Sequence, residues 1–203
     1  MLDRAFNAAV QRPLQRMAQV LQRRSWQADH ITWLGFGIGL LALPLIALGQ
    51  PQWALLAMGL NRLADGLDGA LARLTHPTDR GAFLDIALDF LFYASIPLGF
   101  ALATPAHNAL AASVLIYSFI GTASTFLAFA VLAAKRGISS TAFPAKGFYY
   151  LGGLTESVET ITVFVLMCLA PGWFAVLAWG FAALCALTTV TRIVAGVRVL
   201  GSD

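Results

Sequence analysis

Six long apolar blocks, each near the length of a membrane-spanning helix, dominate this chain of 203 residues. Apolar residues make up 59% of the chain and charged residues only 11%, and the apolar residues come in runs that do not alternate with polar ones. Crossing the hydrocarbon layer takes roughly 20 apolar residues in a helix. We therefore predict an all-α integral membrane protein with six transmembrane helices, near residues 29–50, 52–74, 81–104, 107–134, 150–170 and 172–199.

Basic residues gather on alternate connections between these blocks. They precede the first block, flank the loops after the second and the fourth, and lie towards the end of the sixth, at Arg192 and Arg198. The connections around Pro51, Pro105 and Pro171 contain no lysine or arginine. By the positive-inside rule, both termini are cytoplasmic, and we expect a multi-pass protein of the cell (inner) membrane. The net charge of +3 then reflects topology and attraction to anionic lipid, so no nucleic-acid partner is expected.

Residues 1–28 form a basic segment ahead of the predicted membrane domain, residues 29–199. Apolar side chains recur along this segment at helical spacing, at Leu2, Phe6, Val10, Leu14, Met17 and Leu21. We expect an amphipathic juxtamembrane segment on the cytoplasmic surface, which Pro13 breaks or bends into two short pieces. It either anchors the topology or covers a cytoplasmic site. Because the first apolar run is full length, no cleavable signal peptide is expected.

Four aspartates stand inside the second and third apolar blocks, at Asp65, Asp68, Asp85 and Asp89. Each carboxylate at the centre of a spanning helix costs roughly 2.5–3.5 kcal/mol, so the four need compensation. Spacings of three and four place each pair on one helix face, and the short loop between the blocks makes the two helices antiparallel neighbours, with the acids in the cytoplasmic half. Clustered oxygen ligands suit Mg²⁺, Mn²⁺ or Ca²⁺, and we predict a metal site formed by these aspartates.

Small residues and two arginines accompany the acids. The small residues either let a phosphorylated ligand reach the metal or let helices approach; they are Gly66, Gly69, Ala72 and Gly81. Arg73 lies one turn beyond Gly69 and offers a planar fork of donors for a diphosphate. Arg62, midway along the second block, either extends its charge towards the membrane surface or pairs with a carboxylate in the helix bundle.

The run from Asp65 to Arg73, Asp-Gly-Leu-Asp-Gly-Ala-Leu-Ala-Arg, followed by Gly81, Asp85 and Asp89, resembles the signature of the CDP-alcohol phosphotransferases. Two details depart from the usual pattern. Seven residues separate Arg73 from Gly81, where the family usually has eight, and Ala28-Asp29-His30-Ile31-Thr32 stands where a Pro-Asn-x-x-Thr sequence is common. Thr32 is kept. The signature covers only the second and third blocks.

The resemblance implies a metal-dependent membrane enzyme of phospholipid biosynthesis. Such an enzyme transfers a substituted phosphate from CDP-diacylglycerol, the favoured donor here, or from another CDP-alcohol to a hydroxyl acceptor and releases CMP. Asp65, Asp68 and Asp85 would hold Mg²⁺ or Mn²⁺, and Asp89 would complete a second metal site and act as general base. The residues expected to hold the CDP portion are Thr32, Asp65, Gly69, Arg73 and Gly81. Family members commonly form homodimers.

Charged residues beyond the signature are candidates for the acceptor site. Lys135, Arg136 and Lys146 flank the loop that enters the fifth block. They either bind a phosphorylated acceptor, such as glycerol phosphate or inositol phosphate, or are ordinary positive-inside charges. Glu156 and Glu159 share a helix face. They either hydrogen-bond acceptor hydroxyls or form a structural ion pair with Arg62 or Lys146.

Two other classes of function compete with the transferase. A small cation- or proton-coupled transporter also uses aspartates on facing helices, but it would spread them over several helices and both leaflets. A non-catalytic membrane scaffold leaves the cost of the acids unexplained. The aspartates cluster in one leaflet on two helices beside an arginine, and this arrangement favours the enzyme.

Overall fold

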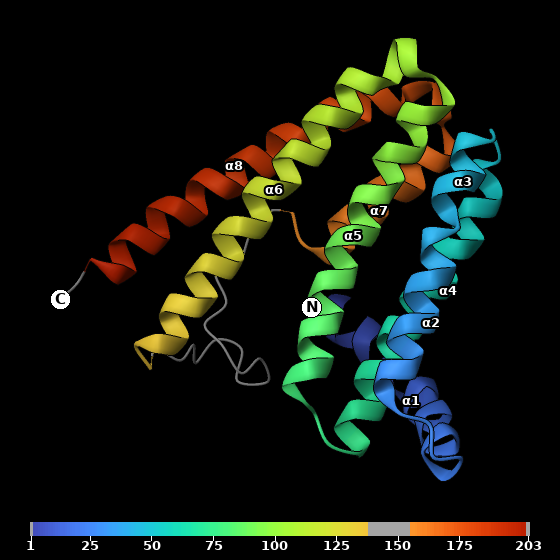
Figure 1. Cartoon of the computed structure of the whole chain (residues 1–203), viewed down its shortest axis with the longest axis vertical. Helices are drawn as coiled ribbons and strands as arrows, with labels where there is room; N and C mark the ends of the chain where they lie inside the picture. Colours follow the sequence, from blue (N-terminus) through green and yellow to red (C-terminus); the bar gives the residue numbers. More distant parts are fainter. Residues whose placement is uncertain (1, 138–154, 202–203) are drawn as a thin grey trace. The chain divides into compact units, whose positions relative to one another are not determined.

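The computed structural model describes residues 2–137 and 155–201, and the regular elements in these ranges are all helical (Figure 1). They are α1 Leu2–Arg23, α2 Ala28–Leu40, α3 Ala42–Ala47, α4 Pro51–Leu74, α5 Asp79–Ala103, α6 Pro105–Lys135, α7 Ser157–Leu169, the short 3-10 helix η1 Pro171–Trp173 and α8 Phe174–Leu200. The chain divides into two compact units, Met1–Gly99 and Phe100–Asp203.

The predicted apolar blocks coincide with helices wherever the structure describes them. The first block is α2 and α3 together, which are separated only at Leu41. Four stretches are long and apolar enough to cross a membrane, namely Ala28–Ala47, Asp79–Ala103, Pro105–Lys135 and Pro171–Leu200. The prediction of an all-helical protein with several such helices is therefore confirmed. The count of six spans stays a prediction, because α4 carries the charged motif and α7 has 13 residues.

Proline marks the start of the helices that follow the uncharged connections. Pro51 and Pro105 occupy the first turn of α4 and α6, and Pro171 begins η1. A proline there lacks only an N–H that would have had no partner within the helix, and its fixed φ suits a helical start. In all three places a proline therefore marks where the next helical segment begins.

The first unit is held together where α1 packs on α4. Ala18 on α1 is fully buried in a cluster with Ile31 of α2 and three residues of α4, Leu67, Ala70 and Leu71. Leu14 and Leu21 pack against the same cluster. Two of the six residues on the predicted apolar face of residues 1–28, Leu14 and Leu21, thus contact protein.

Pro13 lies inside α1, which continues from Leu2 to Arg23 as one helix. The expectation of two short segments is therefore wrong. An interior proline removes one hydrogen bond and costs about 3 kcal/mol. The burial of Ala18 and its apolar neighbours against α4 offsets that cost in part.

Two glycines of α2 bring it close to α4. A Cβ at Gly35 would lie 2.5 Å from Ala64 Cβ, and a Cβ at Gly39 would lie 2.8 Å from the Asn61 side chain. A one-turn repeat of small residues permits close helix contact in membranes, where dispersion forces and hydrogen bonds drive the packing of helices. The positions of α2 and α4 relative to each other therefore depend on the absence of side chains at Gly35 and Gly39.

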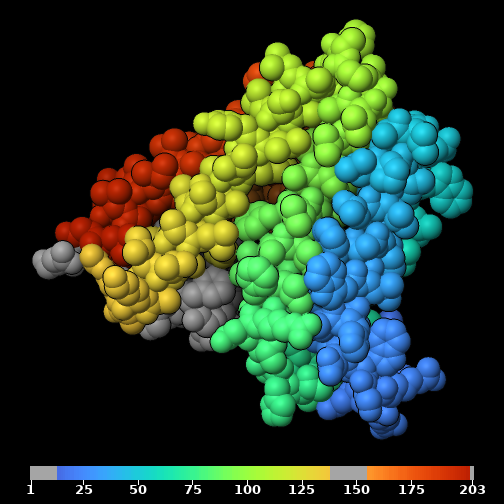
Figure 2. Space-filling model, in the orientation of Figure 1, coloured from blue at the N-terminus to red at the C-terminus, as the bar shows by residue number. Residues whose placement is uncertain are grey.

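In the second unit, α6 and α8 lie side by side (Figures 1 and 2). Gly121 of α6 faces Thr189 of α8, whose Oγ1 would lie 3.0 Å from an added Cβ. Phe119 makes edge contacts with Phe164 of α7 and Phe181 of α8. The outer faces of both long helices remain apolar and exposed, as expected of helices that lie in lipid.

Candidate functional site

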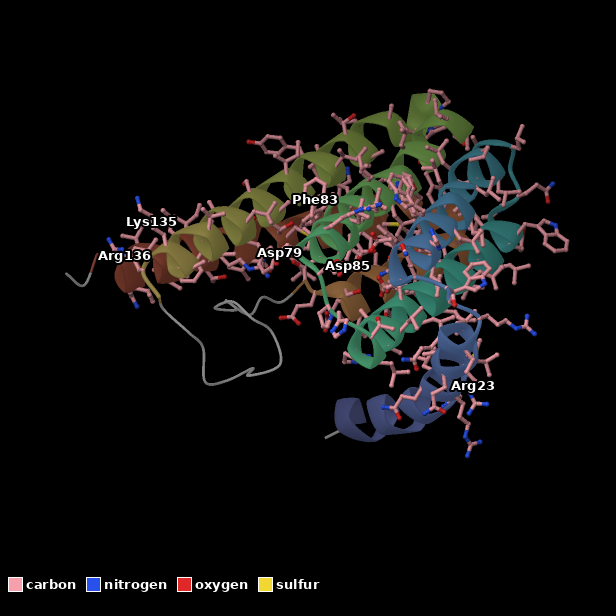
Figure 3. All side chains as sticks on the ribbon, turned by 60° about the horizontal axis from the view of Figure 1, so that its bottom comes forward. Arg23, Asp79, Phe83, Asp85, Lys135 and Arg136 are labelled. Carbon is pink, nitrogen blue, oxygen red and sulfur yellow. The ribbon has the colours of Figure 1, made fainter. Side chains whose placement is uncertain are left out.

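One pocket in the first unit collects the polar residues of the aspartate motif. Side chains from α2, α4 and α5 line it, namely Thr32, Gly35, Phe36, Asn61, Arg62, Asp65, Asp68, Asp85, Leu88 and Asp89. All four predicted aspartates are among them, so the prediction that the two pairs face a common space is confirmed. Figure 3 labels Asp85 and Phe83 on α5, and Phe83 is 69% exposed outside this pocket.

Asp68 is the most enclosed of the four acids, with 6% of its surface exposed. Thr32 on α2 donates a hydrogen bond from Oγ1 to Asp68 Oδ2 at 2.6 Å. The hydroxyl thus fixes one carboxylate oxygen of Asp68. Thr32, which the sequence assigns to the CDP portion, thus lines the pocket and orients an acid of the motif.

Arg62 lies among the aspartates and forms ion pairs with two of them. Its Nη2 donates to Asp89 Oδ1, and its Nη1 donates to Asp89 Oδ2 at 3.4 Å. A weaker contact of 3.7 Å joins Nη1 to Asp65 Oδ2. Of the two uses considered for Arg62, pairing with a bundle carboxylate is confirmed. One guanidinium charge therefore offsets part of the charge of the four acids.

The guanidinium of Arg62 is held on several sides. Asn61 Oδ1 accepts from Arg62 Nε at 2.9 Å and from Nη2 at 2.7 Å, and Tyr93 Oη accepts from Nη1 at 3.2 Å. The charge also lies 5.0 Å from the ring centroid of the buried Phe92, a cation–π arrangement. Such a set of partners leaves little rotational freedom, so the charge is fixed in place.

Asn61 connects this network to α2. Its Nδ2 donates to the Gly35 carbonyl at 3.0 Å, and 5% of the Asn61 surface is exposed to solvent. The missing side chain at Gly39 leaves the space that Asn61 occupies. The close approach of α2 and α4 is therefore what allows Asn61 to orient Arg62.

The acids line a common pocket but do not converge on one point. Among residues 2–137 and 155–201, no group of three or more histidine, cysteine, aspartate or glutamate side chains is close enough to hold a metal ion. The chemistry of the donors nevertheless fits a hard divalent cation, because all four are carboxylates that border the same space. Arg62 lines the same pocket and pairs with Asp89 there.

The remaining residues expected to hold CDP do not line this pocket. An added Cβ at Gly69 would meet the Arg73 guanidinium at 3.4 Å, and the Gly81 N–H donates to Thr78 Oγ1 at 3.0 Å. Asp29, in the first turn of α2, pairs with Arg80 at 3.1 Å. The structure thus ties the start of α2 to the start of α5 on the side where Gly81 lies.

Gly66 serves helix packing. A Cβ there would lie 3.0 Å from Leu14 Cδ1 of α1. Of the two interpretations of the small residues, helix approach is therefore the one that the structure supports at Gly66. The N-terminal helix reaches the motif at the residue next to Asp65.

The candidate acceptor residues belong to the second unit. Lys135 and Arg136 end α6 (Figure 3), and Arg136 Nη1 donates to the Leu200 carbonyl at 2.7 Å. Lys146 lies outside the described residues. Glu156 and Glu159 form a capping box at the start of α7, in which Glu159 accepts from the Glu156 N–H at 3.1 Å. The carboxylates that the structure pairs with Arg62 are Asp65 and Asp89. The alternative of a structural ion pair for the two glutamates stays a prediction.

Asn61, Gly35 and Tyr93 are functional neighbours that the sequence prediction did not include. Each has a feature in the sequence by which it could be identified. Asn61 lies one turn before Asp65 in an apolar span, Tyr93 lies one turn after Asp89, and Gly35 opens a Gly-x-x-x-Gly repeat. Polar residues one turn from a motif acid are thus useful candidates for side chains that orient it.

Comparison with known proteins identifies one family and several relatives of this chain. The sequence profile of the CDP-alcohol phosphatidyltransferase family matches residues 26–193. The inner membrane protein YnjF of Escherichia coli is 54% identical over 202 residues, which are 100% of this chain and 98% of that protein. The phosphatidylcholine synthase of Pseudomonas aeruginosa is 37% identical over 86 residues, covering 40% of this chain and 36% of that protein.

Solved structures share the fold. Phosphatidylinositol phosphate synthase of Mycobacterium tuberculosis with CDP-DAG bound has a TM-score of 0.68 at 22% identity, covering 92% of this chain and 94% of that chain. The same synthase in complex with manganese and citrate has a TM-score of 0.67 over 90% of this chain and 88% of that chain. At this level of identity, the likeness establishes the helical architecture.

Proposed function

This chain belongs to the CDP-alcohol phosphatidyltransferase family, and from that premise we propose that it transfers the phosphatidyl group of CDP-diacylglycerol to the hydroxyl of an acceptor alcohol and releases CMP. The family makes the protein a metal-dependent transferase of phospholipid biosynthesis. The single observation that carries the assignment is the pocket in which all four aspartates of the signature meet Thr32.

The aspartates are the proposed metal ligands. Asp65, Asp68 and Asp85 would hold one divalent cation and Asp89 would complete a second site, with Mg²⁺ or Mn²⁺ as the ion. Bound there, the cations would neutralise the diphosphate of the donor and stabilise the charge on departing CMP. Support comes from the hard oxygen donors of one pocket and from the manganese complex of the mycobacterial synthase.

Asp89 is the proposed general base. Its carboxylate borders the pocket and is 28% exposed, so an acceptor hydroxyl can reach it. The proton of that hydroxyl would pass to Asp89 as the oxygen attacks the phosphorus of the donor. Arg62 forms an ion pair with the same carboxylate and orients it.

The CDP portion is proposed to contact Thr32, Asp65, Gly69, Arg73 and Gly81. Gly69 leaves open space beside the Arg73 guanidinium, which supports a diphosphate oxygen approaching between them. The acceptor is proposed to carry a phosphate that Lys135, Arg136 and Lys146 attract, with Glu156 and Glu159 near its hydroxyls. The capping box already engages these glutamates with the start of α7, which weighs against Glu156 and Glu159 in that role.

The proposed topology has six spans, both termini and the active site in the cytoplasm, and α1 at the cytoplasmic surface. The basic residues at the ends of α1, α4, α6 and α8 support it, as does the similarity to an inner membrane protein. The charged α4 would cross the membrane inside the bundle, because its acids face the pocket. A homodimer is proposed from the family alone.

The deciding experiment measures CMP release by purified protein with CDP-diacylglycerol, Mn²⁺ or Mg²⁺ and a panel of alcohol acceptors. We expect release that depends on one acceptor and falls about 10²-fold or more in Asp89→Asn. Asp79→Asn, which removes an exposed carboxylate at the start of α5, should retain activity. Release with a soluble CDP-alcohol and diacylglycerol, and with no other pair, would reverse the roles of donor and acceptor.

A further inference from the structure

The most unusual group in the pocket is a fixed cation among residues proposed to bind cations. The Arg62 guanidinium donates to both oxygens of Asp89, and 18% of its side chain is exposed. A bidentate arginine–carboxylate pair is among the stronger charge-assisted contacts in proteins. The pair directs both Asp89 oxygens towards Arg62, and the Tyr93 hydroxyl donates to Asp89 Oδ2 at 3.2 Å, so another cation must compete with these donors for Asp89.

The three other aspartates are engaged much less. Asp65 lies 3.7 Å from Arg62, and Asp68 accepts a neutral hydroxyl donor from Thr32. Within the described part of the chain, the ion pairs of Arg62 reach neither Asp68 nor Asp85. Arg62 thus pairs with Asp89 more closely than with any of the three other motif aspartates.

The position of Arg62 is also supported by groups that no cation would replace. Asn61 Oδ1 accepts from Arg62 Nε and Nη2, and Tyr93 Oη accepts from Arg62 Nη1. The Phe92 ring lies under the guanidinium. Moving the guanidinium away would leave Asn61 Oδ1 without these donors in a region where Asn61 is 5% exposed. A cation that takes Asp89 must overcome this network as well as charge repulsion.

We propose that Arg62 competes with a divalent cation for the Asp89 carboxylate, so that the pocket binds its first metal ion more tightly than its second. This inference rests on the proposed function for the existence of the metal sites. Without the second metal ion, Arg62 neutralises the charge of Asp89. Arg62 therefore sets the metal concentration at which the second ion binds. Arg62 is thereby a positioning residue whose influence falls on Asp89.

The test is a Mn²⁺ titration of metal-free protein without substrate, followed by electron paramagnetic resonance of the free ion and by calorimetry. The wild type should show two dissociation constants that differ by about tenfold or more. Arg62→Met should tighten the second site by about tenfold and change the first by only a few-fold. Arg62→Gln removes the same charge and keeps a polar side chain, so it replaces Arg62→Met if the latter does not fold.

Arg16→Met is the matched control, because it removes an exposed guanidinium from α1 outside the pocket. Its effect on both constants should be small, since exposed charges are screened by salt. Unchanged second-site binding in the neutral Arg62 variants would overturn the competition, as would two equal sites in the wild type. Absence of any Mn²⁺ binding would instead contradict the metal sites of the proposed function, which the CMP-release assay tests independently.

Discussion

Thr32 on α2 and Asp68 on α4 are joined by a hydrogen bond of 2.6 Å from the threonine hydroxyl to one carboxylate oxygen. The bond links the segment before the motif to the motif itself. The same hydroxyl also lies 3.1 Å from the Ala28 carbonyl within α2, and the shorter contact goes to Asp68. Side chains that orient metal ligands in this way commonly govern both affinity and rate.

Replacing Thr32 by valine should therefore weaken the site with little change in shape. We expect Thr32→Val to lower Mn²⁺ affinity and kcat/KM for CMP release by about 10- to 100-fold, and Thr32→Ser to restore most of both. Thr162→Val serves as the control, because the Thr162 hydroxyl donates to the Val158 carbonyl within α7 and lies outside the pocket. An equal loss in Thr32→Ser would show that the methyl group of Thr32, and not its hydroxyl, is what matters.

The glycines of α2 allow a prediction on stability with an internal control. Gly35→Ala places a Cβ 2.5 Å from Ala64 Cβ, where the helices must separate. Overpacking of this kind costs about 1–3 kcal/mol. Gly37 has open space at the corresponding position, so Gly37→Ala should stabilise the helix by up to about 1 kcal/mol.

Unfolding of the purified variants in mixed detergent measures both changes. Gly35→Ala should have the lower free energy of unfolding, and its CMP release should also fall because Gly35 lines the pocket. Gly37→Ala should unfold no more readily than the wild type. If the two variants are equally stable, the close contact between α2 and α4 does not limit stability.

Much of this site follows from the sequence because helical periodicity is a local property. Asp65 and Asp68, like Asp85 and Asp89, lie within about one turn of each other, and a short loop brings the two helices together. The signature of the family then identifies the chemistry. The shared pocket of the acids is therefore predictable before any tertiary contact is known.

The residue with which a long side chain forms an ion pair cannot be predicted in the same way. Arg62 has several carboxylates within reach, and its choice of Asp89 depends on Asn61, which in turn depends on the gap at Gly39. Similarly, the continuity of α1 through Pro13 depends on burial against α4. Such features arise from packing between segments distant in sequence, and local patterns carry no information about them.

Metal binding should stabilise the folded protein through the aspartates. A ligand that binds only the native state at 100 times its dissociation constant adds about 2.7 kcal/mol. We expect Mn²⁺ to raise the unfolding temperature of the wild type and EDTA to reverse the effect. Asp68→Asn should lose most of the increase, because it replaces a carboxylate that Thr32 orients, whereas Asp79→Asn should retain it. An increase of the same size in Asp68→Asn would exclude Asp68 as a ligand.

The orientation of α5 provides the most direct test of the proposed topology. This helix has 25 residues, so it is about 37 Å long at 1.5 Å per residue. Since the hydrocarbon core is about 30 Å thick, the connections at its two ends should lie on opposite sides of the membrane. His76 precedes α5 and His107 follows it, and both are exposed.

Single cysteines at these positions report the two sides. In a background with Cys168→Ala and Cys185→Ala, an impermeant maleimide should label His107→Cys in intact spheroplasts and His76→Cys only in inverted vesicles. Cys168 and Cys185 are buried, with 0% and 1% of their surfaces exposed. Alanine is the replacement because it is small and apolar. Labelling of both sites from one side would mean that α5 does not cross the membrane, and the aspartate pocket would then lose its proposed place at the cytoplasmic face.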